Sequence, residues 1–363
     1  MSTGTFSYPL PTNEPVLNYA PGSAEKKRLK EVLKELKSQV ADIPQFIGAK
    51  EVRSGNKIAI RPPHEKKHVL GYFHKGEEKH VVQAIEAALA VKQHWCSLSW
   101  ENRAHIFLKA ADLLATKYRP YINGTTMLGQ SKNAYQAEID AACEFIDFLR
   151  FNVHFLSEIY KQQPISSPGM HNRMEYRPLE GFVLAVTPFN FTSIGGNLPT
   201  VAALCGNVVI WKCAYTQVYS AQLIMRILKE AGLPDGVINL VYVDGPTVGN
   251  VCFSHRDFAG VHFTGSTQVF NAMWSTIGKN ISTYKSYPRI VGETGGKDFV
   301  IAHKSADPSV VATALLRGAF EFQGQKCSAA SRAYIPSNIA EEVKKKLVAG
   351  VRQFKMGTVE DFT

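Results

Sequence analysis

The sequence predicts an α/β fold in which a doubly wound parallel sheet is followed by the start of a second α/β domain. Between residues 182 and 274, apolar strand-like runs alternate with amphipathic helix-like runs, an order that builds β-α-β units. The chain has 363 residues and is 45% hydrophobic, so it can bury a large core in more than one domain. No internal repeat or low-complexity linker interrupts it.

The first 180 or so residues are predicted to be mainly helical. Residues 1–23, rich in Pro, Ser, Thr and Asn, predict an irregular arm. Apolar residues three and four positions apart predict helices at 24–40, 78–96, 100–117 and 134–160. The last of these is apolar on nearly every side and is therefore expected at the centre of the fold. Strands are expected at 57–61 and 68–73, as a hairpin, and at 173–177.

The later part of the chain follows the alternating pattern. The expected strands are 182–186, 208–211, 237–241 and 260–263, and the expected helices are 196–203, 218–231, 246–252 and 267–274. Open sheets of this type bind ligands beyond the carboxyl ends of their strands, so residues at those ends are candidates by position. We place a domain boundary after residue 296. Residues 1–296 hold the arm, the helices and the sheet, and residues 297–363 begin the second domain with a helix at 308–322 and a strand at 333–335.

The distribution of charge and of cysteines argues against a nucleic-acid-binding protein and against a metal site. The formal net charge is +10, and residues 24–80 hold 14 Lys and Arg against 8 Asp and Glu. This excess lies mainly on one amphipathic helix and the hairpin, without zinc-finger spacing, an RNA-binding aromatic motif or an arginine-rich tract. We therefore expect a solvated basic face and no nucleic-acid partner. The six cysteines are dispersed without metal-binding spacing, which indicates a reducing compartment and no metal site.

No segment is expected to target or anchor the chain. Residues 1–15 lack the charged and apolar regions of an export signal. The most apolar long stretch, 182–211, is broken by prolines, glycines and asparagines, so no membrane span is expected. We expect a cytoplasmic protein, or one of the mitochondrial matrix if its source is eukaryotic.

Cys327 is the candidate nucleophile. It lies on a turn between an expected helix and an expected strand, and loops held by rigid elements often carry reactive groups. Gly324 permits a sharp turn. The polar residues around the thiol favour the thiolate, which is the reactive form; they are Gln325, Lys326, Ser328 and Ser331. An inert buried cysteine is the alternative, and residues elsewhere in the chain must decide between the two.

Further polar residues lie at the ends of expected strands. Asn190 follows the first strand and could donate a hydrogen bond to an oxyanion, and Lys212 directly follows the second and can reach a ribose or a phosphate. Residues 265–269 join a strand to a helix whose first amides can hold a pyrophosphate. Glu293 follows an apolar strand, which suits a general base, and Glu144 is a charge in an apolar helix. Each could instead be an ordinary turn asparagine, surface lysine or solvated glutamate.

Taken together, these residues describe one chemistry. A thiolate at Cys327 adds to an aldehyde carbonyl, Asn190 and a backbone amide hold the oxyanion, and hydride leaves for a nicotinamide. Water activated by Glu293 then hydrolyses the resulting thioester.

Five short motifs in this order resemble the aldehyde dehydrogenase family. They are Thr187 to Phe191, Trp211 to Lys212, Phe263 to Ser266, Glu293 to Lys297 and Gly324 to Cys327. The likeness is greatest to the members that oxidise L-glutamate 5-semialdehyde to L-glutamate in proline degradation. It rests on the helix at 144–153, on Tyr287 to Arg289, on the two residues that flank the cysteine, and on the long N-terminal extension.

The resemblance implies a Rossmann-type NAD domain, a catalytic domain and a role for each candidate. Cys327 would be the nucleophile, Glu293 the proton acceptor and Asn190 the stabiliser of the transition state. The residues that would contact NAD, the implied cofactor, are Thr187, Pro188, Phe189, Lys212, Gly265, Ser266, Thr267, Gln268 and Val269. The residues that would contact the substrate are Glu144, Phe191, Lys326 and Ser328. A homo-oligomer is implied for the full-length form.

The chain departs from the family pattern in sequence and in length. Many members have a glycine where this chain has Phe270, and a glutamate where it has Tyr215, which affects the contacts to the cofactor ribose. Members also continue far beyond the cysteine. This chain is therefore expected to be a C-terminally truncated fragment that exposes apolar faces.

Three other functions stay open. A dehydrogenase of another small semialdehyde, such as succinate semialdehyde, would be saturated as readily by a substrate that lacks the amino group. An inactive NAD-binding or partner-binding fragment would bind the cofactor without thioester chemistry. A nucleic-acid binder would use the basic face, and binding that does not depend on salt would exclude it.

Overall fold

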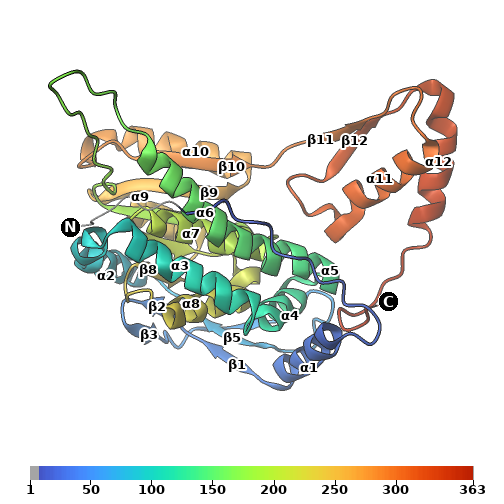
Figure 1. Cartoon of the computed structure of the whole chain (residues 1–363). Coiled ribbons are helices and arrows are strands. Elements are labelled where there is room, and N and C mark those ends of the chain that lie inside the picture. The colour runs from blue at the N-terminus through green and yellow to red at the C-terminus, as the bar shows by residue number, and fades with distance from the viewer. Residues whose placement is uncertain (1–7, 363) are drawn as a thin grey trace.

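A seven-stranded sheet forms the centre of the molecule, which a computed structural model describes for residues 8–362 (Figure 1). The first seven residues of the expected arm lie outside the described residues. The parallel strands are β6 (Phe182–Val186), β7 (Val208–Lys212), β8 (Ile238–Val241), β9 (Phe258–Gly265) and β10 (Arg289–Thr294). Two short antiparallel strands, β2 (Gln45–Ile47) and β3 (Lys50–Val52), extend one edge. The doubly wound parallel sheet is thus confirmed.

The strand order, β10-β9-β6-β7-β8-β2-β3, fixes where a ligand can bind. The chain moves from β6 through β7 to β8 in one direction, then returns to the other side of β6 to form β9 and β10. The connection from β6 to β7 and the connection from β8 to β9 therefore lie on opposite faces of the sheet. Between β6 and β9 this arrangement opens a crevice at the carboxyl ends of the strands.

Helices cover both faces of this sheet. On one face α7 (Thr192–Leu204) contacts β6, β7 and β9, and α3 (Trp100–Ala115), α6 (Glu144–Lys161) and α8 (Val218–Ala231) pack on α7. The other face carries α2 (Glu78–Ser97), α9 (Gly245–Ser254) and α10 (Thr267–Lys279). The central strands are apolar on both sides for this reason, and β7 buries Trp211 completely.

The N-terminal region holds the expected hairpin and several elements that were not expected. Strands β4 (Lys57–Ile60) and β5 (Gly71–His74) pair antiparallel, β1 (Ala41–Ile43) joins β5, and α1 (Ala24–Ser38) packs on α4 (Arg119–Gln130). The missed strands β1, β2 and β3 have three residues each, too few for an alternating pattern. The missed helix α4 buries polar residues, including Asn123, Thr125 and Thr126, which hides its period in the sequence.

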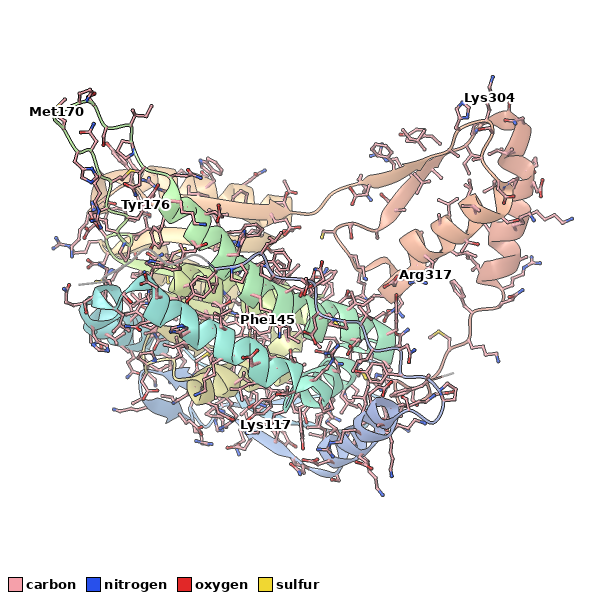
Figure 2. All side chains as sticks on the ribbon, viewed as in Figure 1. Lys117, Phe145, Met170, Tyr176, Lys304 and Arg317 are labelled. Carbon is pink, nitrogen blue, oxygen red and sulfur yellow. The ribbon has the colours of Figure 1, made fainter. Side chains whose placement is uncertain are left out.

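One expectation for residues 134–177 is confirmed and one is wrong. The helix expected at 134–160 is a continuous helical run, although a π-helical turn (Glu138–Cys143) divides it into α5 (Ala134–Ala137) and α6. The strand expected at 173–177 is a loop, part of an exposed segment that projects from the body with Met170 near its tip (Figure 2). No neighbouring strand offers this segment a ladder of hydrogen bonds in the described part of the chain.

The last part of the chain forms a small separate unit. Strands β11 (Asp298–Ile301) and β12 (Ala330–Tyr334) pair parallel, and α11 (Pro308–Phe320) and α12 (Ser337–Val351) pack together (Figure 1). Their core consists of Val311, Ala312, Leu315, Ile339 and Val343. Residues 352–362 then return to the main body, where Val359 is buried and Phe362 meets Tyr19. A boundary after residue 296 stays a prediction. Within residues 8–362 no helix is both long and apolar enough to cross a bilayer.

Candidate active site

Cys327 lies on the nucleophile loop, which we define as residues 320–328, between α11 and β12. Its Sγ donates to Oε1 of Glu293 at 3.6 Å. Burial, together with the nearby carboxylate of Glu293, raises the pKa of the Cys327 thiol. The expectation that the loop favours the thiolate is therefore wrong. The lysine beside it, Lys326, pairs with Asp140 and Glu321.

Glu293 reaches Cys327 from the edge of the central sheet. It lies in β10, opposite Thr264 of β9, at the carboxyl end of the strand rather than after it. A Cβ at the preceding residue, Gly292, would lie 2.3 Å from the ring of Phe270, so a larger residue there would displace that ring. The carboxylate is therefore presented by a regular strand at the same end of the sheet as the crevice.

Asn190 approaches the nucleophile loop from the end of β6. Its Nδ2 donates to the backbone oxygen of Gln325 at 2.9 Å, two residues before Cys327. The predicted catalytic residues Cys327, Glu293 and Asn190 therefore meet at one place, although they come from three separate segments. Their roles stay predictions.

A cavity of about 570 Å³ opens in front of Cys327 and Glu293. It is lined by all four residues predicted to contact the substrate, namely Glu144, Phe191, Lys326 and Ser328. Ser193 Oγ donates to Oε2 of Glu144, and burial raises the pKa of Glu144. Burial alone would lower the pKa of Lys326, but the carboxylates of Asp140 and Glu321 raise it. The cavity thus offers both a carboxyl group and a cation to a small polar substrate.

Sequence reasoning missed three residues in or next to this cavity. Lys132 is completely buried and pairs with Asp140 at 2.6 Å, and Asp140 lines the cavity. His262 lines it as well, and its Nδ1 lies 3.3 Å from the backbone oxygen of Leu198; burial lowers its pKa. The one available signal was the pair of acidic residues four positions apart, 140 and 144, in an otherwise apolar stretch.

The predicted cofactor residues lie at the carboxyl ends of β6, β7 and β9. Thr187 follows β6 and its Oγ1 accepts from Nε1 of Trp211 at 3.1 Å, with Pro188 and the half-exposed Phe189 next along the chain. Lys212 ends β7 and its Nζ lies 5.6 Å from the ring centre of Tyr215. These residues and the start of α10 share one end of the sheet.

The start of α10 fits a dinucleotide. Gly265 ends β9, and Ser266 caps the helix by accepting from the amide of Val269 at 3.3 Å. The first turn, which includes Thr267 and Gln268, has no acidic residue to repel a phosphate. Phe270, in the same helix, stacks on Phe263 of β9. Among residues 8–362 no group of three or more His, Cys, Asp or Glu could hold a metal ion.

Comparisons with known proteins show what the chain as a whole is similar to. The profile described as Aldehyde dehydrogenase family matches residues 51–362. The chain is 50% identical to the mitochondrial delta-1-pyrroline-5-carboxylate dehydrogenase of Dictyostelium discoideum, over 98% of this chain and 64% of that protein. It is 48% identical to the enzyme of the same name from Agaricus bisporus, over 99% of this chain and 66% of that protein. The chain thus spans slightly less than two thirds of these relatives.

Solved structures are similar to the chain as well. The Delta-pyrroline-5-carboxylate dehydrogenase of Mycobacterium tuberculosis, bound with NAD, is 50% identical and superposes with a TM-score of 0.97, over 100% of this chain and 68% of that one. A Thermus thermophilus 1-pyrroline-5-carboxylate dehydrogenase mutant is 27% identical, with a TM-score of 0.91 over 98% of this chain and 69% of that one.

Proposed function

This chain belongs to the aldehyde dehydrogenase family, and we propose that it serves the NAD-dependent oxidation of L-glutamate 5-semialdehyde to L-glutamate. The observation that carries the proposal is the 3.6 Å contact between the Cys327 thiol and the Glu293 carboxylate at the mouth of the polar cavity. The names of relatives that are about half identical support the choice of substrate.

The reaction begins with proton transfer from the Cys327 thiol to Glu293, which is needed because the thiol has a raised pKa. The sulfur then forms a bond to the aldehyde carbon, and the carbonyl oxygen becomes an oxyanion. Asn190 Nδ2 can turn from the Gln325 carbonyl to donate to it, together with a backbone N–H of the nucleophile loop. NAD, when bound in the crevice, supplies a hydride acceptor, so that a thioester remains on Cys327.

Glu293 acts a second time in hydrolysis. After its proton has left to solvent, the carboxylate removes a proton from water, which attacks the thioester carbon. The carbon–sulfur bond breaks, the acid product leaves, and the sulfur is released as a thiolate that regains a proton. A single base thus serves both halves of the reaction.

Substrate recognition is proposed to use the rest of the cavity. Glu144 would bind the ammonium group, Lys326 and Ser328 the carboxylate, and Phe191 the aliphatic chain. A bound ammonium would return the raised pKa of Glu144 to lower values and keep it charged.

The proposal extends to surroundings and assembly. All six cysteines are free, which supports a reducing compartment, such as the cytoplasm or the mitochondrial matrix. We also propose a homo-oligomer for the full-length form and neither a nucleic-acid nor a membrane partner.

NADH formation from glutamate semialdehyde and NAD tests the proposal. Parent protein, Cys327→Ala and the control Cys96→Ala, on α2, are compared, with NAD binding followed by calorimetry. We expect Cys327→Ala to lose oxidation and keep NAD binding, and Cys96→Ala to match the parent. Turnover by Cys327→Ala equal to that of the parent would reject the nucleophile. NAD binding without turnover by any of the three would identify an inactive NAD-binding chain.

A further inference from the structure

Lys132 is a buried cation that the proposed mechanism does not use. It follows α4, is 0% exposed, and pairs with Asp140 Oδ2 at 2.6 Å. Its Nζ lies 4.3 Å from the ring centre of Phe191 and 4.6 Å from that of Phe322. Burying a charge is costly, and burial lowers the pKa of Lys132 to about 8. An apolar side chain would fill the same space at lower cost, so the cation calls for an explanation.

The second aromatic ring belongs to a strained turn. Phe322 and Gln323 both have left-handed backbone conformations, with φ of 48° and 54°, ahead of Gly324 at 71°. Non-glycine residues adopt this conformation at an energetic cost, and it persists only where surrounding contacts enforce it. Phe322 is buried to 2% exposure with its ring on Lys132, so the cation is one of the contacts that enforce the turn.

The same cation is connected to the nucleophile loop by a second route. Asp140 accepts from Lys132 and also pairs with Lys326 at 3.2 Å, and Lys326 directly precedes Cys327. Lys326 Nζ in turn lies 5.4 Å from the ring centre of Phe191 and bonds Glu321 at 3.0 Å. The loop is therefore attached to the main body at Phe322, the first of its left-handed residues, and at Lys326, which follows them.

We propose that Lys132, acting with Asp140, is a positioning residue that holds the nucleophile loop so that Cys327 stays within reach of Glu293. It does so by seating the Phe322 ring and by fixing the carboxylate that anchors Lys326. Lys132 itself does not line the cavity, and it contacts the lining residues Asp140 and Phe191. The inference rests on the proposed function only in treating Cys327 as the reacting thiol.

Alkylation of Cys327 by iodoacetamide tests the proposal without any turnover. The rate is measured against pH, peptide by peptide, in the parent, in Lys132→Met and in the control Lys117→Met. Lys117 is also paired with a carboxylate, Glu230, at 2.8 Å and lies 4.7 Å from the ring centre of Tyr118, but it is exposed on the body away from the unit that carries Arg317 (Figure 2). Cys213 and Cys252, both 0% exposed, report unfolding within the same samples.

In Lys132→Met the freed loop should carry Cys327 away from Glu293 and toward water, so the pH midpoint of its alkylation should fall. A fall of about one pH unit gives roughly tenfold faster alkylation below the midpoint. Electrostatics alone predicts the opposite sign, because removal of a cation raises a thiol pKa. We expect Lys117→Met to match the parent and Cys213 and Cys252 to stay unmodified in both variants.

A Cys327 profile in Lys132→Met that coincides with that of the parent, or a midpoint that rises, would overturn the proposal, provided the buried cysteines stay protected. If they react because the variant unfolds, Phe322→Leu decides, since it removes the ring and keeps the Lys132–Asp140 pair. The same downward shift is expected there, and an unchanged midpoint rejects the proposal. Absence of turnover in the NADH assay would reject the proposed function. The alkylation result would still decide whether Lys132 positions the loop, because it does not depend on turnover.

Discussion

At the scale of single residues, Glu293 affects Cys327 in two opposing ways. As a neighbouring negative charge it disfavours the thiolate, and as a proton acceptor it can generate one. In Glu293→Gln the alkylation midpoint of Cys327 should move down, toward the ordinary thiol value of about 8.5, but not reach it because burial remains. In turnover the same variant should slow thioester hydrolysis more than thioester formation.

Iodoacetamide titration and the lifetime of the acyl-enzyme check these two effects separately. An exposed glutamate, Glu175 of the projecting loop, provides the control as Glu175→Gln, which should match the parent. A midpoint that rises in Glu293→Gln would contradict the placement of the carboxylate, and an unchanged acyl-enzyme lifetime would contradict its role as base.

The site residues that the sequence predicted lie at the ends of regular elements, whereas those it missed are defined by packing between distant segments. Cys327, Asn190 and Glu293 were recognisable because each ends or follows a regular element and lies in a short motif. Lys132 and Asp140 acquire their meaning only from packing, because their partners Phe322 and Lys326 are far along the chain. A lysine near a turn looks solvated in sequence, and only the fold reveals that it is buried.

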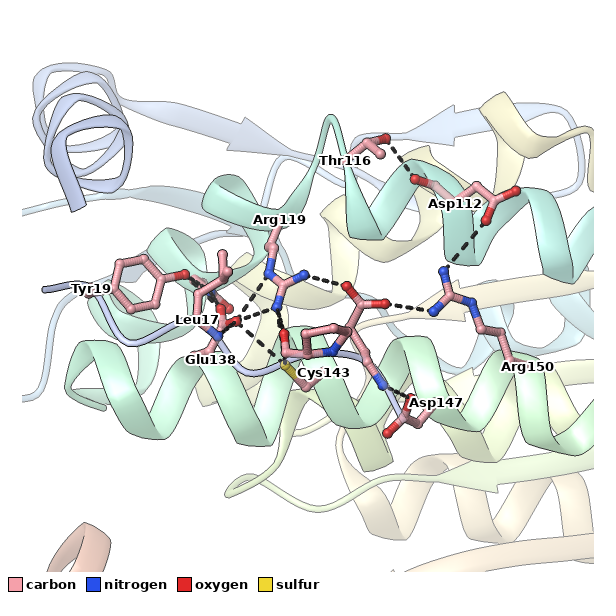
Figure 3. Close-up of polar contacts among 12 residues, drawn as sticks. Leu17, Tyr19, Asp112, Thr116, Arg119, Glu138, Cys143, Asp147 and Arg150 are labelled. Carbon is pink, nitrogen blue, oxygen red and sulfur yellow. Dashed lines mark hydrogen bonds and ion pairs between the residues drawn. The ribbon is translucent and has the colours of Figure 1, made fainter. Parts of the chain in front are cut away.

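At the scale of elements, the N-terminal arm is fastened to the π-helical turn by a buried network (Figure 3). Arg119 Nη1 donates to Oε1 of Glu14 at 2.5 Å, and Arg119 also pairs with Glu138, which is 0% exposed. Tyr19 Oη donates to Oε2 of Glu138 at 2.6 Å. The turn that carries Asp140 is thus held by the arm on its other side.

Removal of the guanidinium should therefore cost stability. Arg119→Met leaves the buried Glu138 without a cation, which should cost about 3–5 kcal/mol of unfolding free energy. The control is Arg150→Met. Arg150 pairs with Glu14 but is 26% exposed, so its loss should cost about 1 kcal/mol or less. Despite burial, Arg119 and Tyr19 hold the pKa of Glu138 below its ordinary value. The loss of unfolding free energy in Arg119→Met should thus be largest at neutral pH and shrink as the pH falls through the ordinary glutamate range. Urea unfolding at several pH values measures the stability of both variants and its dependence on pH. Equal losses of unfolding free energy in Arg119→Met and Arg150→Met would contradict this account.

The elements themselves were predictable where their pattern is long. The β-α-β run from β6 to α10 was readable because buried strands alternate with helices whose apolar faces repeat. The π-helical turn inside 134–160 was not, because one inserted residue leaves the sequence on both sides of it helical in pattern. The loop at 173–177 was read as a strand from local residues, although a strand needs a partner that local sequence does not specify.

At the scale of the whole molecule, stability is unevenly distributed between the main body and the unit formed by β11, β12, α11 and α12. Helices α8 and α12 are a close comparison, with 14 and 15 residues respectively. Ten residues of α8 are buried, from Val218 to Ala231, but only Ile339 and Val343 of α12 are. Burial of apolar surface is the main favourable contribution to the free energy of folding. Helix α12 should therefore unfold locally far more often than α8.

Native-state hydrogen exchange tests this inequality. We expect the amides of α12 and β12 to exchange on the order of 100-fold faster than those of α8 and of β6, which is paired on both sides. The returning segment should exchange more slowly than α12, because Val359 is buried in the main core and Glu360 bonds Lys37 at 2.5 Å. Equal protection of α8 and α12 would mean that the two parts open as one. The expected inequality would instead place the nucleophile loop at the junction of a rigid and a mobile part, where fixed contacts such as that of Lys132 matter most.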